Sequence, residues 1–319
     1  MKRTIFTLLT LLLTLTLTIS AHAEDYLAVN LLDTLCAPSC AIETDSGALV
    51  VTDVFNKRVW TVEDGQATLL AGAESVLDRY EEPMGGYSDT TPAESLFAEP
   101  WAIAPFLDGY AVSDTGNNVL RFITRNRVQT LNGHTSNPLI RIAQTGVIYD
   151  RPTGLTADEE GNLYVSNTES GRIYRLSPNG EVIIYFDQLT EPMGLCWQDG
   201  TLYVAETGAH RIVRIIDDEL QVVAGSGQEG FVDGPAAEAR FSWPNGVTVD
   251  ADGTVYVADT ANSAIRRIRN SEVETVLQRT DRSTDTFPFS PRSLLLTREG
   301  ELLVCDPYAR MLCSVPTDD

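Results

Sequence analysis

The chain has 319 residues, enough for one large domain or two ordinary ones, and its hydrophobic content of 43% is ample for a buried core. Its formal net charge of −22 repels phosphate backbones and attracts cations and basic surfaces. The composition therefore excludes wholesale disorder and makes nucleic acid an unfavourable partner.

The first element that the sequence predicts is a signal peptide over residues 1–23. Two basic residues precede an apolar run over residues 5–19, and Ala21-His22-Ala23 has the A-x-A pattern of a cleavage site. Removing the two basic residues changes the net charge from −22 to −24. We expect a secreted or extracytoplasmic mature chain, a single domain over residues 24–319 without a transmembrane segment.

The elements that follow are repeated along the chain. Residues 151–167 (RPTGLTADEEGNLYVSN) and 243–259 (WPNGVTVDADGTVYVAD) each contain an apolar strand, an Asp/Gly turn and a second apolar strand that ends on an acid or amide. A third and a fourth strand follow in each copy, predicted over residues 172–176, 181–186, 264–268 and 273–277. Four short strands separated by turns form one blade of a propeller.

The pattern occurs six times, about 50 residues apart, a period that suits propeller blades. The residues that close the second strands are Asp53, Asp114, Asn167, Glu206, Asp259 and Asp306. The pattern P-x-G-h-x-h-D-x-x-G-x-h-Y-V-x-D-T resembles the NHL repeat over about residues 36–315. The resemblance implies an all-β, six-bladed β-propeller of four-stranded antiparallel blades, without any assigned chemistry.

The sixth repeat ends after its third strand, around residues 311–315, which leaves its sheet one strand short. Residues 26–32 form a spare apolar segment ahead of the first repeat. Since a blade alone cannot bury both of its faces, we expect this N-terminal strand to pair with the sixth blade and close the ring.

Five cysteines accompany the predicted export, an odd number that leaves at least one of them unpaired within the chain. Cys36 and Cys40 are close enough in sequence to bridge, and Cys305 and Cys313 fall on neighbouring strands of one hairpin. Cys196 lies in an apolar strand and is expected to be a buried free thiol. The sequence leaves the connectivity open.

Two long loops, over residues 72–99 and 225–242, are copies of each other, since GYSDTTPAESLF aligns without gaps to GFVDGPAAEARF. Three blades separate them, which indicates a duplicated half-ring and places them on opposite sides of one face, the top. Their aromatic residues either form walls of a binding surface or fill gaps between blades: Tyr87, Phe97, Phe231 and Phe241, with Tyr80, Phe287 and Phe289 nearby.

Known chemistries of secreted six-bladed propellers are poorly matched by this chain. Lactonases that it resembles hold calcium with the residue between Pro and Gly of the first strand, and here only Asn245 supplies a suitable oxygen. Zinc lyases need several histidines, whereas the mature chain has His134 and His210, the latter at a turn position that varies among the repeats. The closing acids are expected to be structural, and residues 250–253 a hairpin turn.

The sequence therefore favours a binding or scaffold module, expected to be a monomer, that takes an extracellular protein, peptide or glycan on its top face. No catalytic residue or metal ligand is assigned, and calcium is left open. A second hypothesis is a lactonase-like hydrolase or lyase with any metal at Asn245, and a third is a structural envelope component. The candidate ligand-binding residues at the channel mouth are Trp101, Thr153, Met193, Asn245 and Arg292.

Overall fold

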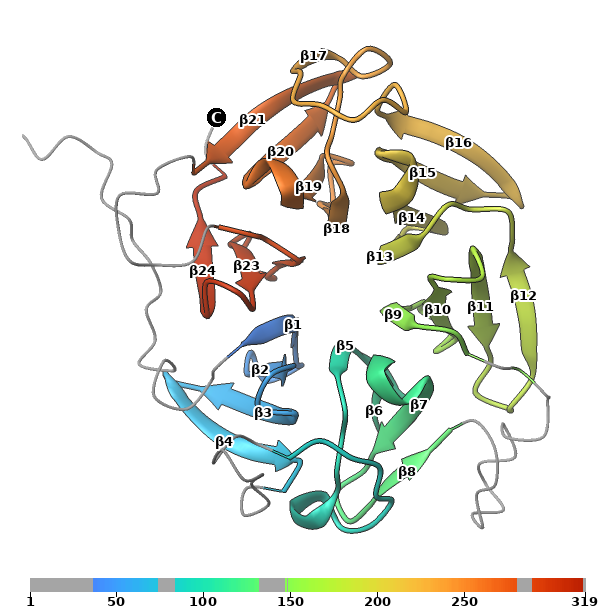
Figure 1. Ribbon diagram of the computed structural model, residues 1–319, viewed down its shortest axis with the longest axis vertical. Helices are drawn as coiled ribbons and strands as arrows, with labels where there is room; N and C mark the ends of the chain where they lie inside the picture. The colour runs from blue at the N-terminus through green and yellow to red at the C-terminus, as the bar shows by residue number, and fades with distance from the viewer. Residues whose placement is uncertain (1–36, 74–83, 132–146, 148, 280–288, 318–319) are drawn as a thin grey trace, which may run out of the picture.

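The computed structural model describes residues 37–73, 84–131, 147, 149–279 and 289–317. Six antiparallel sheets are arranged radially around one axis (Figure 1). This confirms the predicted β-propeller with six blades. Within the described ranges, no helix is long and apolar enough to cross a membrane.

In each of the first five blades, consecutive strands run outward from the channel. The strands of blades one to three are β1 (Pro38–Glu43), β2 (Leu49–Asp53), β3 (Arg58–Glu63), β4 (Gln66–Ala71), β5 (Pro100–Phe106), β6 (Gly109–Asp114), β7 (Val119–Ile123), β8 (Val128–Thr130), β9 (Pro152–Ala157), β10 (Leu163–Asn167), β11 (Arg172–Leu176) and β12 (Val182–Phe186). Those of blades four and five are β13 (Pro192–Gln198), β14 (Thr201–Glu206), β15 (Arg211–Ile216), β16 (Glu219–Ala224), β18 (Pro244–Val249), β19 (Val255–Asp259), β20 (Ala264–Arg269) and β21 (Glu272–Gln278).

Blade six has three described strands, β22 (Ser293–Leu296), β23 (Leu302–Asp306) and β24 (Met311–Val315). The sequence predicted that its third strand would be the last one supplied by the C-terminal part of the chain, and β24 is that strand. The segment expected to supply the fourth strand, residues 26–32, lies outside the described residues, so closure of the ring by this segment stays a prediction.

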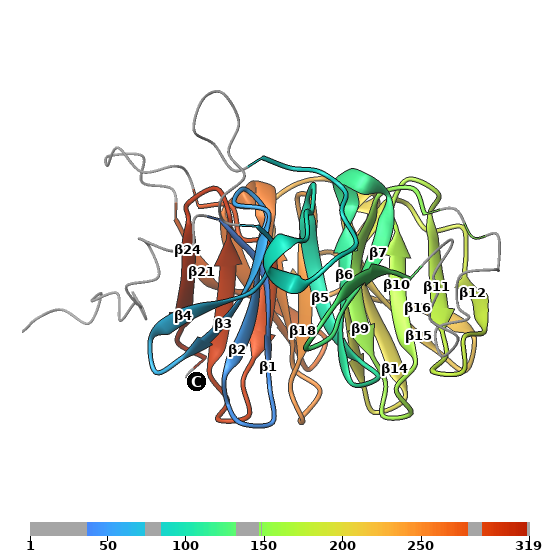
Figure 2. The same ribbon diagram turned by 90° about the horizontal axis from the view of Figure 1, so that it is seen from below.

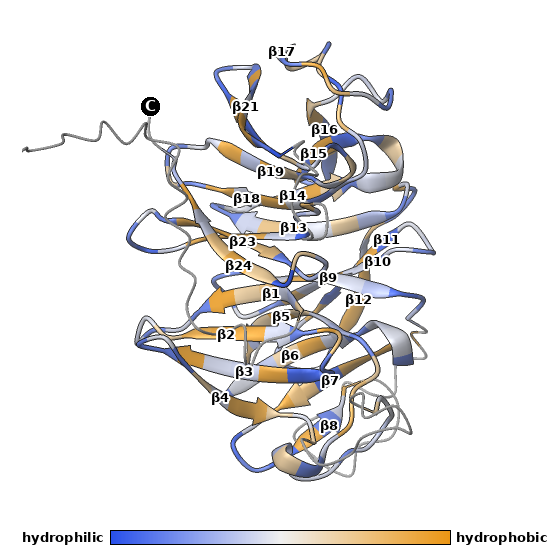
Figure 3. Ribbon diagram, turned by 60° about the vertical axis from the view of Figure 1, so that its left-hand side comes forward, coloured by the Kyte–Doolittle hydropathy of each residue, from blue (hydrophilic) through white to orange (hydrophobic). Residues whose placement is uncertain are grey.

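The hydrophobic core lies between neighbouring blades. One cluster joins Ala111 and Phe122 of blade two to Leu163 and Leu176 of blade three, and all four side chains are at most 2% exposed. Figure 3 shows hydrophobic residues along the strands and hydrophilic residues at many of the turns. The sheets therefore pack face against face around the axis, as strands with two buried faces require.

The six closing residues have the structural role that the sequence predicted. Each ends the second strand of its blade, and each accepts a hydrogen bond from a backbone N–H just before the first strand of that blade. Asp259, for example, accepts from the Ser242 N–H at 2.8 Å and from the Asn262 side chain at 2.8 Å. The other five are Asp53, Asp114, Asn167, Glu206 and Asp306.

The residue after the closing acid ties one blade to the next. In blades two to five this residue is a threonine that begins a short 3₁₀ helix or turn, and its hydroxyl donates to a carbonyl at the start of the following blade. Thr207, which begins η5 (Thr207–Ala209), donates to the Pro244 carbonyl at 2.7 Å. The same bond is made by Thr115, Thr168 and Thr260.

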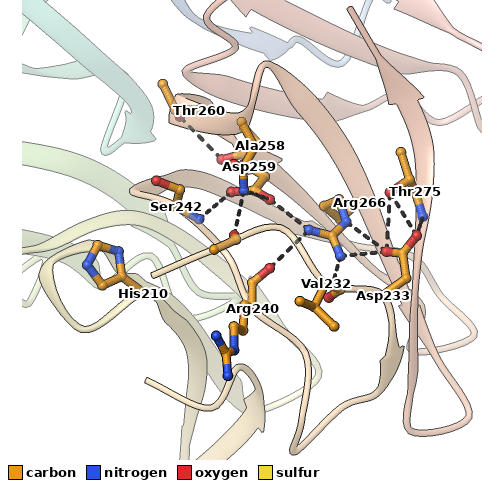
Figure 4. A network of polar contacts seen from close by, with 12 residues as sticks. His210, Val232, Asp233, Arg240, Ser242, Ala258, Asp259, Thr260, Arg266 and Thr275 are labelled. Atoms are coloured by element: carbon orange, nitrogen blue, oxygen red, sulfur yellow. Dashed lines mark hydrogen bonds and ion pairs between the residues drawn. The ribbon is translucent and has the colours of Figure 1, made fainter. Parts of the chain in front are cut away.

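Each of the two long loops covers one buried arginine, which lies on a strand of the blade that the loop enters. Arg266 on β20 is fully buried; it contacts Asp233 and donates to Asp259 at 2.8 Å (Figure 4). Its guanidinium also lies against the rings of Phe231 and Phe241. Each ring centroid is about 5 Å from the guanidinium carbon.

Arg121 on β7 repeats this arrangement in the opposite blade. It pairs with Asp89 at 2.8 Å and Asp114 at 3.1 Å, and lies against Tyr87 and Phe97. We call these two assemblies the arginine clasps. Because each loop also bonds the outer strand of the blade it enters, Tyr87 and Phe231 pack at the outer part of the ring and are not walls of the channel mouth.

Cys305 and Cys313 lie on the adjacent strands β23 and β24, but not opposite each other. Cys305 is paired with Leu312 and Cys313 with Val304, so the two side chains point to opposite faces of the sheet. Cys40, Cys196, Cys305 and Cys313 are free thiols, while Cys36 is outside the described residues. The expectation for Cys196 is met in part, since its thiol is free but the residue is only half-buried. Burial raises the pKa of Cys196.

Candidate functional site

The top face has a cavity of about 660 Å³ centred on the channel mouth, which we call the upper cavity. It is lined by the turns between second and third strands and by the residues that lead into the first strands. The opposite face carries the turns between first and second strands, such as those after β1 and β18 at the lower edge of Figure 2. The longest connections therefore surround the mouth on one side only.

Four of the five predicted site residues meet at the floor of this cavity. Trp101, Met193, Asn245 and Arg292 line both the upper cavity and a second cavity of about 160 Å³ inside the channel. They form the constriction between the two spaces. Thr153 lines neither, because its hydroxyl is buried against Ser166 and Thr168 of its own blade, at 3.0 and 2.7 Å.

Arg292 is the central cation of this floor. Its guanidinium carbon lies 5.9 Å from the ring centroid of Trp101 and 5.1 Å from that of Tyr308. With its amide oxygen facing the arginine, Asn245 accepts a hydrogen bond from Nη1 and donates through its amide nitrogen to the Trp243 carbonyl at 3.3 Å. Burial lowers the pKa of Arg292, and Tyr308 and Asp306 oppose that effect.

Among the described residues, Arg292 makes no ion pair with a carboxylate, and its buried Nε has no hydrogen-bond partner. Asp306 acts on it electrostatically from beyond ion-pair distance. The two arginines of the clasps, which are fully buried, each pair with two carboxylates. A buried cation is stabilised by paired charge, so Arg292 is the one of these three that is left open to an anion.

Aromatic side chains surround this cation. Phe55, Trp243 and Tyr308 line the upper cavity and are 42%, 43% and 40% exposed, which is high for residues of this kind. Phe55 and Tyr308 are in edge-to-face contact at 5.7 Å. Together with Trp101 below, they give the cavity flat apolar walls.

Several residues at the rim have a strained backbone. Arg151, Glu191 and Trp243 each precede the proline that begins a first strand, and their φ values are 51°, 45° and 50°. Residues other than glycine rarely adopt this left-handed region, and such strain gathers at functional sites. All three side chains line the upper cavity.

The cavity carries more positive charge than the chain as a whole. Lys57, Arg151 and Arg292 contribute cations, Glu99 and Glu191 contribute carboxylates, and Arg151 is paired with Glu169 at 3.0 Å. With this partner counted, the charges at the mouth balance, on a chain whose net charge is −22. The mouth therefore repels anions less than the rest of the molecule does.

The mouth does not fit a calcium ion held by Asn245. The amide oxygen of Asn245 is engaged by the guanidinium of Arg292, and this fixed charge would repel a second cation. Calcium also requires six or more oxygen ligands, with carboxylates among them. In the described part of the chain, no group of three or more His, Cys, Asp or Glu residues could hold a metal.

His210 has a structural contact. It ends η5 with φ 53°, and its Nδ1 accepts the Trp243 N–H at 3.2 Å while the two rings meet edge to face. The equivalent position is left-handed in every blade, at Lys57, Asn118, Gly171, His210, Ser263 and Arg310. His134 lies outside the described residues.

Among the residues of the upper cavity that sequence reasoning missed are Phe55, Lys57, Arg151, Trp243 and Tyr308. Two of them immediately precede the first-strand proline, and three lie in the turn just after the closing acid. Both positions could have been found from the repeat alignment, because every blade directs them to the top face. What the alignment did not contain was the left-handed backbone that turns Arg151 and Trp243 toward the axis.

Residues 36–291 match the family described as SMP-30/Gluconolactonase/LRE-like region. The match covers well over half of the chain. The chain belongs to this family. The NHL repeat, with which the sequence was compared above, belongs to a related group of propellers.

Known proteins share the fold at low sequence identity. The chain is 28% identical over 261 residues to Protein SUPPRESSOR OF QUENCHING 1 of Arabidopsis thaliana, covering 71% of the chain and 23% of that protein. It superposes with TM-score 0.62 on an auxiliary nutrient binding protein from Bacteroides thetaiotaomicron, at 14% identity over 88% of this chain and 69% of that one. A gluconolactonase from Xanthomonas campestris gives 0.61 at 16% identity, over 89% and 87%.

Proposed function

We propose that the chain is a lactonase-like hydrolase or lyase that acts on a small carbonyl compound in the upper cavity, without a bound metal ion. The observation that carries the proposal is Arg292, a half-buried guanidinium at the cavity floor with no carboxylate paired to it among the described residues. Membership of a family whose description includes gluconolactonase supports the same direction. Of the two main hypotheses from the sequence, the family favours the enzyme.

The residues on the cavity floor suit the charge that develops during ester or lactone hydrolysis. When water attacks the carbonyl carbon, negative charge develops on the carbonyl oxygen, and donors fixed in a partly buried site stabilise it. Arg292 supplies such donors and a full positive charge, the role that a metal ion performs as a Lewis acid elsewhere.

Glu99 and Glu191 line the same cavity and are the candidate bases. In the proposed reaction a carboxylate takes a proton from the attacking water, the bond between the carbonyl carbon and the ester oxygen breaks, and the proton passes to that oxygen. The products are a carboxylate and an alcohol, which remain joined in one molecule when the substrate is a lactone.

Turnover of a panel of phenyl esters and five- and six-membered lactones tests the proposal. Replacing one donor to a developing oxyanion costs about 100-fold or more, so Arg292→Met should lower kcat/KM by at least that factor. Arg298→Met is the matched control, because Arg298 is 56% exposed and pairs with Asp45 away from the cavity. Chelation with EDTA should leave the rate unchanged.

Turnover that EDTA abolishes would overturn the metal-free assignment, and absence of turnover across the panel would overturn the hydrolase. In that case a second candidate function, a secreted module that binds an extracellular protein, peptide or glycan, is favoured. The specific observation for it is the group of exposed aromatic side chains at the cavity, Phe55, Trp243 and Tyr308. Native mass spectrometry of protein from its source would then be expected to show a ligand that Arg292→Met no longer retains.

A further inference from the structure

The upper cavity shows three large aromatic side chains to solvent around one open cation. Phe55 lies in the turn between β2 and β3, Trp243 precedes β18, and Tyr308 lies in the turn between β23 and β24. They come from three blades, so no single repeat accounts for their gathering. Exposed apolar surface of this kind is unfavourable in water and marks a binding surface when it is continuous.

All three of these aromatic side chains are held by contacts with a neighbouring residue. Trp243 has φ 50°, its N–H donates to His210, and its ring meets His210 edge to face. Phe55 and Tyr308 contact each other edge to face. A strained backbone and fixed rings indicate walls that are already arranged before a ligand binds, which lowers the entropic cost of binding.

The charge at the floor defines the other half of the ligand. Arg292 lines the same cavity, 5.1 Å from the Tyr308 centroid, and has no carboxylate partner among the described residues. A guanidinium pairs with carboxylates in a planar geometry. Lys57 adds positive charge at the rim, whereas Arg151 is paired with Glu169.

We infer that the upper cavity binds flat, unsaturated ring compounds that carry a carboxylate, with the ring between the aromatic walls and the carboxylate on Arg292. This inference rests on the proposed function, since such a carboxylate is the product of hydrolysing an ester or lactone of a ring compound. It goes further by naming the class of substrate as a planar ring system. A saturated sugar lactone has no aromatic π system and can offer Trp243 and Tyr308 only its C–H groups.

Three probes of similar size separate the two requirements in isothermal titration calorimetry. 2-Naphthoate has the flat ring and the charge, trans-decalin-2-carboxylate keeps the charge on a saturated skeleton, and 2-naphthylmethanol keeps the ring without the charge. A stacking or charged contact of this kind contributes roughly a factor of five to thirty in affinity, so both controls should bind about tenfold or more weakly than 2-naphthoate.

Single-residue variants test which residue binds the carboxylate of the probe and which binds its flat ring. Arg292→Met should weaken 2-naphthoate about tenfold and leave 2-naphthylmethanol unchanged, whereas Trp243→Ala should weaken both. Arg292→Lys keeps the charge without the planar donors and should be intermediate. Arg298→Met and Leu107→Ala are controls for charge and for exposed apolar surface, since Leu107 is 47% exposed outside the cavity.

The outcomes distinguish this inference from the proposed function. Binding of 2-naphthoate that depends on Arg292, without turnover of any ester or lactone, supports the inference and overturns the hydrolase. Turnover of saturated lactones with no preference for 2-naphthoate over the decalin carboxylate overturns the inference and keeps the hydrolase. Equal affinity of the wild type and Arg292→Met for 2-naphthoate, with both proteins folded by urea titration, also overturns the inference.

Discussion

Polar residues of this propeller fall into two kinds, which differ in whether their charged and hydrogen-bonding groups have partners. The closing acids are buried and accept several hydrogen bonds, as Asp306 does from the N–H groups of Ser290, Tyr308 and Ala309. Arg292 is half-buried and has no carboxylate partner in the part of the chain that the structure describes. Residues of the first kind hold the local structure in place. Residues of the second kind remain able to bind a ligand.

Asp306 gives a prediction about pH. Burial raises the pKa of its carboxyl above the ordinary value of 3.8, and the three N–H donors oppose the rise. A carboxyl with a raised pKa binds its proton more tightly in the folded state than in the unfolded state. Its contribution to stability is therefore full below the unfolded pKa and is lost as pH rises through the folded pKa.

Asp306→Asn cannot titrate, and Asn167 shows that an amide holds the equivalent position in blade three. Urea titrations at a series of pH values from 3.8 upward should show the free energy of unfolding of the wild type falling relative to that of Asp306→Asn. Two curves that stay parallel over this range would contradict the assigned burial effect.

At the scale of the element, the connection between blades depends on threonines that follow the closing acids. The hydroxyl of Thr207 is 1% exposed and donates across to the first strand of blade five. The bond joins the top of one sheet to the start of the next, which is where the cavity residues lie. These ties therefore hold the spacing of the side chains around the mouth.

Thr207→Val keeps the shape of the side chain and leaves the Pro244 carbonyl without its donor. Loss of a buried hydrogen bond with one partner left behind should lower the free energy of unfolding by about 1–3 kcal/mol in urea titration. Thr68→Val on the exposed outer strand β4 is the control and should change it far less. If the two variants were equally stable, the threonine tie would have no energetic role.

At the scale of the whole molecule, the arginine clasps stand in blades two and five, on opposite sides of the ring (Figure 1). The aligned loops, the paired aromatics and the buried arginine occur in both, so the duplication inferred from the sequence extends to the side-chain contacts. Blade six has no such clasp among its described residues, which fits a half-ring repeat of three blades.

The clasps give a prediction about additivity. Removing one partner of a buried ion pair leaves uncompensated charge and costs about 3–5 kcal/mol, so Arg121→Met and Arg266→Met should each lower the free energy of unfolding by about that amount. Because the two sites share no contacts, the loss in free energy of unfolding of the double variant should equal the sum of the losses of the two single variants. Guanidinium chloride titration measures it, with Arg298→Met as the surface control. A double variant no less stable than either single one would show that the clasps form one cooperative unit.

The sequence was sufficient for the fold, and less so for the site. Strand ends such as Asp259 and Asp306 were predicted to the residue, because Pro, Gly and Asp repeat at fixed offsets from them. Four mouth residues were found by the same register. Thr153 was misplaced because its hydroxyl bonds within its own blade, and Trp243 was missed because backbone conformation, which no residue pattern encodes, turns it toward the axis.

A guanidinium is part of the chain, so it does not have to be bound from solution as a metal ion does. Arginine keeps its proton throughout the range of pH in which proteins function, so the mouth would carry its electrophile from the moment of folding. The proposed activity would therefore not depend on the concentration of free divalent metal ions around the protein. Under the proposed metal-free function, Arg292 beside Asn245 would make folding of the chain the last step before activity.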